Sequence, residues 1–406
     1  MSLSSVCMLS VHTCPIAALG GKKTGGMNVY IRDLARELGN RNIHVDIFTR
    51  CEAKDTAEVK RLGPNVNVIH IPSGPAKALD PINIYPHLDE FTANVLVYAE
   101  KNQVKYDLIH AHYWLSGLVG LKLKQQWHIP LLQTFHTLGK VKETFMPNHQ
   151  EPLTRLASEK TLVQTVDHIL AFTPEEQQHL VSLYSTLPKK ISLIPPGIDT
   201  NRFKPIPQAE AKAHLGISKD QQLLLFVGRL DPIKGIETLL QALALLENAC
   251  DCHEVCLAII GGDEAPNDYE GKVKQLAKDL GIHNITTFLG SREQKVLPYY
   301  YSAADMTIVP SSHESFGLVA LESMACGTPV VASKVGGLQY LIKDHQTGLL
   351  VESQQPKALM EAIHSLITDP TLAEKLGQSA HLHAQNYSWK IITPQILSLY
   401  NSLLRN

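Results

Sequence analysis

Short apolar runs alternate with longer amphipathic stretches along most of this 406-residue chain. Runs such as IHVDIFT (43–49) and YDLIHAH (106–112) have the length of strands, whereas MNVYIRDLARELGN (27–40) repeats apolar residues at helical spacing. Parallel strands need a long crossover, which is usually a helix, so the alternation is typical of a parallel sheet. The sequence therefore predicts an α/β fold in which helices cover both faces of a parallel sheet.

The alternation breaks at IPPGIDTNRFKPIP (194–207), which holds four prolines and a glycine, and then begins again. This composition is typical of a linker. The apolar runs before it are SVCMLSV, IHVDIFT, VNVIHIP, YDLIHAH, IPLLQTF, HILAF and ISLIPPG, and those after it are QLLLFVG, VCLAIIGG, ITTFLG, MTIVPS, PVVAS and GLLVE. We predict two doubly wound, Rossmann-like domains at 1–195 and 196–385, and a helical segment at 386–406. Because ligands of such sheets bind beyond the carboxyl ends of the strands, we expect the domains to face each other across a cleft.

Composition excludes several function classes. The formal net charge is −2 without a basic stripe, so no nucleic-acid partner is expected. No run of eighteen apolar residues occurs, so no membrane span is expected. The opening MSLSSVCMLSVHT has no basic residue before its apolar run, which favours a first strand over a signal peptide. The odd count of seven cysteines favours free thiols in the reducing cytoplasm.

One cysteine cluster has the residue types of a zinc site. Cys250, Cys252, His253 and Cys256 lie in NACDCHEVC, but C-x-C-H-x-x-C is not a standard finger spacing. Cys256 also begins the apolar run VCLAIIGG, where a buried thiol is ordinary core. We therefore expect no metal site.

Two cations follow the first apolar run of the second half. VGRLDPIKG (227–235) brings Arg229 and Lys234, five residues apart, to a strand end. An arginine can hold two phosphate oxygens and a lysine adds a point charge, so the pair suits a diphosphate. A surface loop with solvated charges is the alternative.

A second motif, PSSHESFGLVALESMACGTPVVAS (310–333), follows the run MTIVP. We predict that Ser315 caps a helix opened by Phe316, Gly317 and Leu318, whose free N–H groups would bind an anion. Glu314 and Glu322, eight residues apart, would then accept hydrogen bonds from sugar or ribose hydroxyls. The alternative is a capped helix with one exposed glutamate.

GRLDPIKG and ESFGLVALE resemble the donor-site signature of the retaining GT-B glycosyltransferases of family 4, including its E-x7-E motif. TGGMNVYIRDLARELGNR, DLIHAHYWLSG, TFHTL and IPPGID extend the resemblance over the first half. It implies a last helix that crosses back to the first domain, a UDP-sugar donor and no essential metal or cofactor, with Mg²⁺ at most a stimulating ion. It also implies that Arg229 and Lys234 stabilise the donor diphosphate, Glu314 meets the donor sugar and Glu322 meets the ribose.

Within that family, the first half resembles the mycothiol-pathway inositol-phosphate glycosyltransferases and, almost as closely, the sucrose-phosphate synthases. The resemblance implies that Tyr113, Thr137 and Arg155 face an acceptor phosphate, that Asn28 meets an acceptor hydroxyl, and that His136 meets the donor sugar. The mycothiol enzymes carry a phosphate-binding lysine where GPAKALDPINIYPHLDEF has Pro81. Lys77, four residues earlier, either replaces that lysine or marks a different acceptor.

The histidines in and after the apolar runs differ in how well they are placed for a functional role. His110 lies inside its run and is expected to be structural, whereas His112 and His136 are better placed. The loop GGKKTGGMNVY (20–30) has no G-x-G-x-x-G, so it is not a dinucleotide loop. We expect Gly25 and Gly26 to let its backbone approach the donor diphosphate, and Lys22 and Lys23 to be a solvated pair.

These observations predict a cytoplasmic retaining enzyme that moves glucose or N-acetylglucosamine from UDP to a small phosphorylated polyol or sugar. Transfer to fructose 6-phosphate and transfer to a lipid-linked glycan are alternatives within glycosyltransferases. A UDP-sugar 2-epimerase and a non-catalytic sugar-nucleotide binder are alternatives outside them. The oligomeric state is left open, with a homodimer as one option.

Overall fold

The computed structural model describes residues 3–17, 25–145, 150–249, 255–262 and 268–405. The chain divides into two compact units. The first comprises Met1–Ala17, Gly26–Gly197 and Trp389–Asn406, and the second is mainly Ile198–Ser388.

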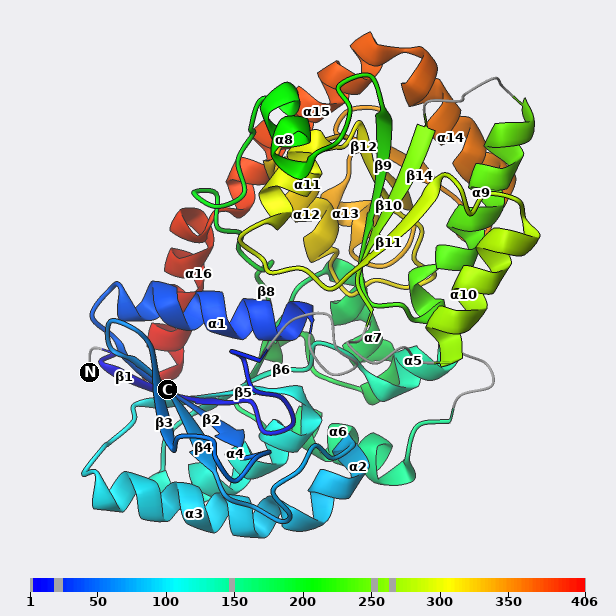
Figure 1. Ribbon diagram of the computed structural model, residues 1–406. Helices are drawn as coiled ribbons and strands as arrows, with labels where there is room; N and C mark the ends of the chain where they lie inside the picture. The colour runs from blue at the N-terminus through cyan, green and yellow to red at the C-terminus, as the bar shows by residue number, and fades with distance from the viewer. Residues whose placement is uncertain (1–2, 18–24, 146–149, 250–254, 263–267, 406) are drawn as a thin grey trace. The chain divides into compact units, whose positions relative to one another are not determined.

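The first unit is built on an eight-stranded sheet in the order β3-β4-β2-β1-β5-β6-β7-β8 (Figure 1). All neighbouring strands are parallel except β3 and β4, which form an antiparallel pair at the edge. The strands are β1 (Ser5–Leu9), β2 (His44–Arg50), β3 (Val59–Gly63), β4 (Val66–Ile71), β5 (Leu108–His112), β6 (Leu131–Thr134), β7 (His168–Ala171) and β8 (Ile191–Leu193). The sequence analysis missed β3, whose VKRLG is charged and half exposed, because an edge strand buries no continuous apolar face.

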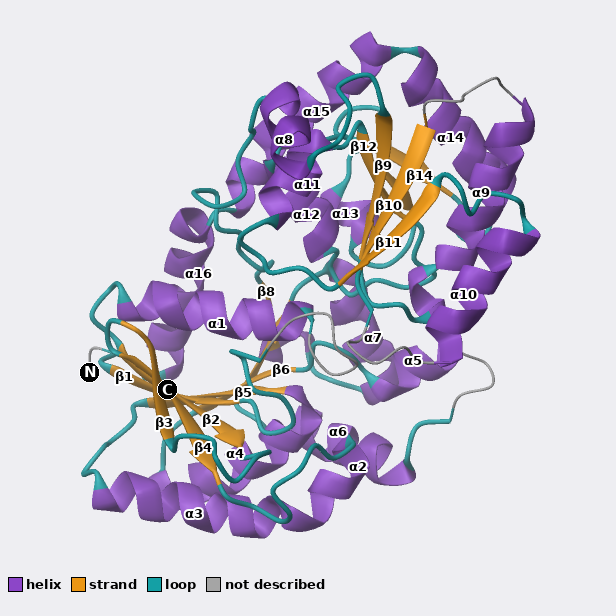
Figure 2. Cartoon of the chain, in the orientation of Figure 1, coloured by secondary structure: helices purple, strands orange, loops and turns teal. Residues whose placement is uncertain are grey.

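Helices cover both faces of this first sheet (Figure 2). Helix α1 packs against α16 on one face, and α4 packs against α3 and α6 on the other. The helical segments are α1 (Gly26–Gly39), α2 (Pro81–Ile84), η1 (Tyr85–His87), α3 (Leu88–Lys101), α4 (Tyr113–Trp127), α5 (Gly139–Phe145), α6 (Leu153–Thr165), α7 (Pro174–Tyr184), η2 (Pro188–Lys190) and α16 (Trp389–Leu403).

The second unit holds a six-stranded, wholly parallel sheet in the order β11-β10-β9-β12-β13-β14. Its strands are β9 (Gln222–Val227), β10 (Val255–Ile260), β11 (Thr286–Gly290), β12 (Met306–Val309), β13 (Val330–Ser333) and β14 (Leu349–Val351). Its helical segments are α8 (Gln208–Leu215), η3 (Pro232–Lys234), α9 (Ile236–Ala249), α10 (Asp268–Asp279), α11 (Leu297–Ala303), α12 (Leu318–Ala325), α13 (Leu338–Leu341), α14 (Pro356–Thr368), α15 (Pro370–Ala384) and η4 (Gln385–Tyr387). The two sheets confirm the predicted α/β fold class.

Strand order fixes where ligands can bind in each unit. The chain builds outward from β1 in one direction and restarts with β5 on its other side, and β9 and β12 repeat this arrangement. Such a switch point opens a crevice beyond the carboxyl ends of the two strands. The loops after β1 and β5, and those after β9 and β12, are therefore the places to look for a site.

The last helix of the chain is anchored in the first unit by a buried hydrogen bond. The hydroxyl of Tyr400 in α16 lies 2.7 Å from Nδ1 of His110 in β5, and Nε2 of His110 lies 3.0 Å from the hydroxyl of Thr134. All three side chains are fully buried. His110 is thus a structural histidine whose two ring nitrogens both have partners.

We expect Tyr400→Phe to lower the free energy of unfolding by about 1–3 kcal/mol, because it leaves a buried ring nitrogen without its partner. Urea unfolding followed by circular dichroism measures the change. The exposed Tyr340 supplies the matched control, since Tyr340→Phe removes a hydroxyl at the surface. Equal stabilities for the two variants would contradict the anchoring role.

Candidate functional site

The loop after β9 carries both cations that the sequence analysis singled out. Asp231 is the N-cap of η3, and its carboxylate accepts the backbone N–H of Ile233 at 3.1 Å. The loop ends at Gly235, which has a φ of 69°. A Cβ there would lie 1.9 Å from the carbonyl oxygen of Pro310, so only glycine allows this close approach. The approach places the β9 loop directly against the loop that follows β12.

An ion pair joins these two loops. Nζ of Lys234 lies 2.6 Å from Oε2 of Glu314, and the hydroxyl of Ser311 lies 3.3 Å from the same oxygen. Arg229 is half-buried in the same loop as Lys234, with its guanidinium 3.8 Å from the carboxylate of Asp231. The fold thus brings Lys234 and Glu314 into contact although 80 residues separate them.

The predicted cap of the following helix is wrong. Helix α12 begins at Leu318, and its N-cap is Gly317, not Ser315. A contact with a later loop explains the difference. The carbonyl of Glu314 accepts the N–H of Gly337 at 2.8 Å, and Gly336 and Gly337 pack against the backbone of 314–316. The chain therefore turns into the helix through Gly317 at a φ of 100°.

This start leaves the first turn of α12 suited to an anion. The N-cap of α12 is a glycine, so the N-cap residue itself has no side chain that could accept from the first turn. A Cβ at Gly317 would lie 2.6 Å from Leu338, so the backbone stays bare there. Helix N–H groups without an internal partner bind phosphates readily.

Glu322, the second acid of the E-x7-E motif, lies inside α12. Its side chain is 7% exposed, and it accepts the hydroxyl of Tyr301 at 2.8 Å and the amide of Gln294 at 3.4 Å. Burial and the nearby Glu322 carboxylate raise the pKa of Tyr301 well above its usual value, so this hydroxyl remains a donor. The predicted contact of Glu322 with a ribose stays a prediction.

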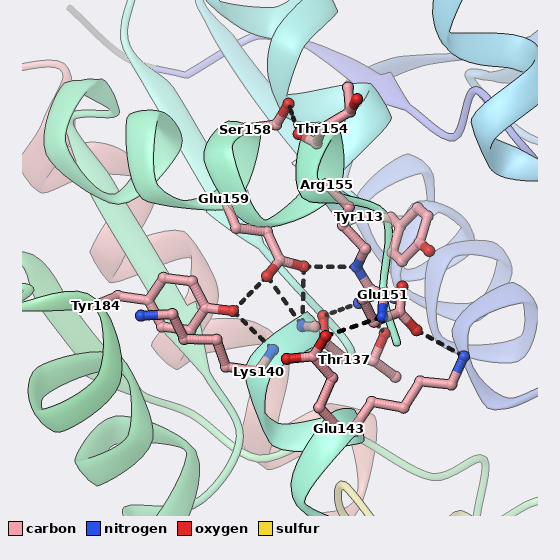
Figure 3. A network of polar contacts seen from close by, with 12 residues as sticks. Tyr113, Thr137, Lys140, Glu143, Glu151, Thr154, Arg155, Ser158, Glu159 and Tyr184 are labelled. Atoms are coloured by element: carbon pink, nitrogen blue, oxygen red, sulfur yellow. Dashed lines mark hydrogen bonds and ion pairs between the residues drawn. The ribbon is translucent and has the colours of Figure 1, made fainter. Parts of the chain in front are cut away.

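In the first unit, the three predicted phosphate residues meet around one buried guanidinium (Figure 3). Arg155, at 3% exposure, donates from Nη2 to both the hydroxyl and the carbonyl of Thr137, each at 3.1 Å. Its guanidinium carbon lies 5.1 Å from the centre of the Tyr113 ring. The start of α4, the loop after β6 and helix α6 thus converge at one carboxyl edge of the sheet.

Two glutamates that the sequence analysis did not single out hold Arg155 in place. Nε of Arg155 donates to Glu159 at 2.8 Å and Nη1 donates to Glu151 at 3.0 Å (Figure 3). Glu151 also pairs with Lys142 at 2.8 Å. Burial works against the charged guanidinium, but Tyr113, Glu159 and Glu151 raise the pKa of Arg155 above its ordinary value. The spacing E-x3-R-x3-E in EPLTRLASE places the charges on one helix face, and this signal could have identified both acids.

Asn28 and His136 lie at the same edge of the first sheet. The buried amide of Asn28 donates to the hydroxyl of Thr13 and to the carbonyl of Cys14, both at 2.8 Å. Nε2 of His136 lies 3.1 Å from Nδ1 of His112. Burial and then His110 and His12 lower the pKa of His136 to about 3, so its ring is neutral near pH 7.

Backbone strain marks this edge as well. His136 has a φ of 60° and Tyr113 a φ of 74°. Side chains other than glycine rarely adopt these values, and such residues concentrate at functional sites.

The remaining predicted residues are placed as follows. Lys77 is exposed in the segment after β4, and Gly26 is the exposed first residue of α1. Lys22, Lys23, Cys250, Cys252 and His253 lie outside the described residues. Cys256 is in β10, where burial raises its pKa to about 11. Across the described ranges, no group of three metal-ligating side chains is present, and no helix is long and apolar enough to cross a membrane.

Two family models match the chain. The model described as Glycosyltransferase Family 4 matches residues 24–202, and the model described as Glycosyl transferases group 1 matches residues 207–383. Together these matches extend over both units.

Similar proteins cover nearly the whole chain. D-inositol 3-phosphate glycosyltransferases from Corynebacterium glutamicum and Acidothermus cellulolyticus are 38% and 40% identical, over 99% and 98% of this chain and 97% and 90% of theirs. The structure of a sucrose-phosphate synthase from Thermosynechococcus elongatus is 35% identical, with a TM-score of 0.92 over 99% of each chain. Anabaena HepE in complex with UDP-glucose, 23% identical, superposes with a TM-score of 0.78 over 98% of this chain and 99% of its own.

The buried histidines predict a pH dependence of stability. Burial lowers the pKa of His110 and of His136 from 6.5 to about 3. The unfolded chain therefore binds more protons than the folded chain between these values, and the free energy of unfolding falls as the pH falls through this window. Each histidine contributes a slope of up to about 1.4 kcal/mol per pH unit.

Urea unfolding at pH 7, 6 and 5 measures this slope, and we expect it to be smaller in His110→Gln than in the wild type. The exposed His345 supplies the control, since His345→Gln should keep the wild-type slope. A His110→Gln slope equal to that of the control would contradict the assignment of a neutral buried His110.

Proposed function

Because this chain belongs to glycosyltransferase family 4 and is a glycosyltransferase of the GT-B fold, we propose that it moves a hexosyl group from a UDP-sugar to a small phosphorylated polyol or sugar, with retention. The observation that carries the proposal is the contact of the buried Arg155 guanidinium with the exposed Thr137 and with the Tyr113 ring in the first unit. The second unit supplies the donor half of the chemistry.

The donor diphosphate is assigned to the two loops at the β9–β12 switch point. Lys234 and Arg229 supply positive charge, and the bare start of α12 at Gly317 and Leu318 supplies N–H groups. Ser315 and Phe316 form the approach to that helix. Glu314 accepts hydrogen bonds, which suits sugar hydroxyls, and its pairing with Lys234 fixes both side chains before the donor binds. UDP as the nucleotide rests on the family resemblance.

The reaction we propose exchanges one glycosidic oxygen for another. The bond between the sugar C1 and the β-phosphate oxygen breaks as the acceptor hydroxyl attacks C1 from the same face. The proton of that hydroxyl passes to the departing phosphate, and UDP leaves. Lys234, Arg229 and the N-terminus of α12 stabilise the negative charge that develops on this phosphate, so no essential metal is needed.

Because His136 is neutral, it is better suited to orienting the substrate than to transferring a proton. Its pKa of about 3 leaves no proton to donate as an acid near pH 7, and its ring is held by His112. We propose that it orients the donor sugar by a neutral hydrogen bond. This role agrees with the strained backbone that aims the side chain.

The acceptor phosphate is assigned to Arg155, Thr137 and Tyr113. Relatives at 38% and 40% identity are named for D-inositol 3-phosphate, and the neighbour at 35% identity is a sucrose-phosphate synthase. Both names imply a small phosphorylated acceptor. We propose inositol phosphate first and fructose 6-phosphate second, in keeping with a cytoplasmic enzyme.

A product screen tests the function directly. Purified enzyme is incubated with UDP-glucose or UDP-N-acetylglucosamine, each with inositol 3-phosphate, fructose 6-phosphate or the unphosphorylated parent compounds, and the products are identified by mass spectrometry. A glycosylated product from one phosphorylated acceptor is expected. Transfer only to a lipid-linked glycan, or donor consumption without any acceptor, would contradict the proposal.

We expect Lys234→Ala to lower kcat by about 100-fold or more, the scale of removing one charge donor from a transition state. Steady-state kinetics at saturating donor and acceptor measure it. Lys295 is the matched control: it pairs with Glu293 on the exposed surface of the same unit, so Lys295→Ala should keep wild-type turnover. Near-wild-type turnover in Lys234→Ala would exclude the diphosphate assignment.

We expect changes in the Arg155 cluster to raise the KM for the acceptor much more than the KM for the donor. Arg155→Ala leaves Glu151 with Lys142 as its remaining cation but removes the cation paired with the buried Glu159, which is destabilising by about 3–5 kcal/mol. Thr137→Ala is therefore the better probe, because Thr137 is exposed and its loss leaves both ion pairs of Arg155 intact. Equal rises in both KM values would argue against an acceptor phosphate here.

A further inference from the structure

The segment after β4 that carries Lys77 is fixed by contacts with three other elements, α3, η1 and β2. At its start, Asn94 of α3 donates to the carbonyl of Pro72 at 2.8 Å, and Ser73 donates to the carbonyl of His87 at 2.6 Å. Glu90 of α3 accepts the N–H of Gly74 at 2.8 Å. Loops on a protein surface are ordinarily its least restrained backbone, so this degree of fixation calls for a reason.

Arg50 holds the other end of the segment. This residue ends β2 and is 1% exposed. Its Nη1 donates to the carbonyl of Pro75 at 2.9 Å and its Nη2 donates to the carbonyl of Lys77 at 2.5 Å. The same guanidinium donates to the carbonyl of Cys51 at 3.3 Å and pairs with the half-exposed Glu52 at 3.2 Å.

These contacts are unusual for a buried charge. Burying a guanidinium is unfavourable unless its donors are satisfied. Here backbone carbonyls and Glu52 accept from both terminal nitrogens of Arg50, and its Nε has no partner among the described residues. An apolar side chain could fill the same space beneath the segment without this penalty. What the guanidinium adds is a fixed backbone on both sides of Ala76, which restricts Lys77 to the torsions of its own side chain.

We propose that Arg50 is a positioning residue for the acceptor: it fixes the backbone of Lys77 so that the exposed ammonium meets the acceptor phosphate without first ordering a loop. This inference rests on the proposed function, because it requires a phosphorylated acceptor that Lys77 contacts. A segment ordered in advance lowers the entropy lost on binding, so Arg50 acts on acceptor affinity. It touches no reacting atom.

A double-mutant cycle tests the proposal in the full-length enzyme. Wild type, Arg50→Lys, Lys77→Ala and the double variant are compared by kcat and by the KM of each substrate, with the acceptor that the product screen identifies. Lysine keeps the charge of Arg50 but cannot bond both carbonyls in the fixed geometry of a guanidinium. Arg41→Lys is the matched control, because the guanidinium of Arg41 bonds Glu37 near the end of α1, away from the segment that carries Lys77.

We expect Lys77→Ala to raise the acceptor KM about tenfold and Arg50→Lys to raise it about fivefold, with the donor KM changed less than about twofold in both. The double variant should match Lys77→Ala alone, because Arg50 acts through Lys77. Effects of the two changes that multiply in the double variant would overturn the proposal. An unchanged acceptor KM in Lys77→Ala would instead show that Lys77 is not part of the acceptor site.

A second variant keeps the test decisive if Arg50→Lys does not fold. Glu90 is exposed, and Glu90→Ala removes the bond to Gly74 of the same segment without altering the core. We expect this variant to raise the acceptor KM about threefold, and not to do so when Lys77 is already alanine. No change of the acceptor KM in Glu90→Ala would contradict a role for the fixed segment.

Discussion

Parallel pairing of strands is the constraint that places the candidate site residues of both units. Each strand must be followed by a crossover before the next parallel strand begins, so the loops after the strands gather at one edge of each sheet. Where the strand order reverses, between β1 and β5 and between β9 and β12, two of these loops diverge and leave backbone and side chains accessible. The loops after β9 and β12 and the cluster of Arg155, Thr137 and Tyr113 both lie at such edges. This arrangement brings residues that are distant in sequence close together in space.

Two buried arginines show two ways in which the first unit stabilises a buried positive charge. The positive charge of Arg155 is neutralised by Glu151 and Glu159, and these two hydrogen bonds hold its guanidinium in place. The same guanidinium contacts Thr137 and the ring of Tyr113. Arg50 is balanced mainly by carbonyls. The first arrangement fixes a cation, and the second fixes a backbone. Both use the forked terminal nitrogens of a guanidinium in a geometry that a lysine could not reproduce.

Much of the fold could be predicted from the sequence because most strands are buried on both faces. β1 and β5 are buried along their whole length, and such strands read as continuous apolar runs. β3 lacks that pattern and was missed. Ser315 has the residue type of an N-cap, but the carbonyl of Glu314 is bound by Gly337 from a later loop, and this contact moves the helix start to Gly317. Local propensity cannot report a contact between residues far apart in the chain.

The same distinction holds for the site. The residue types of Lys234 and Glu314 indicated a phosphate and a sugar, but their mutual pairing needs the close approach of Gly235 to Pro310. The glutamates around Arg155 follow helical spacing and were predictable in principle. Arg50 was not, because nothing in FTRCE shows that its guanidinium reaches Pro75 and Lys77 on another loop. A side chain that bonds backbone carbonyls of a distant loop leaves no pattern in the sequence around it.

Under the proposed function, discrimination between phosphorylated acceptors would lie outside the cluster of Arg155, Thr137 and Tyr113, because a phosphate group is the same on a polyol and on a ketose. The loop after β1 is the natural place for it, since it lies at the β1–β5 switch point beside Tyr113. The ring of His12 in that loop lies 4.2 Å from the ring of Tyr113. Asn28 fixes the loop by bonding Thr13 and Cys14, so its shape is set before the acceptor arrives. Under the proposed function, the cluster of Arg155, Thr137 and Tyr113 would supply affinity for the phosphate, and the loop fixed by Asn28 would supply the contacts that distinguish one acceptor ring from another.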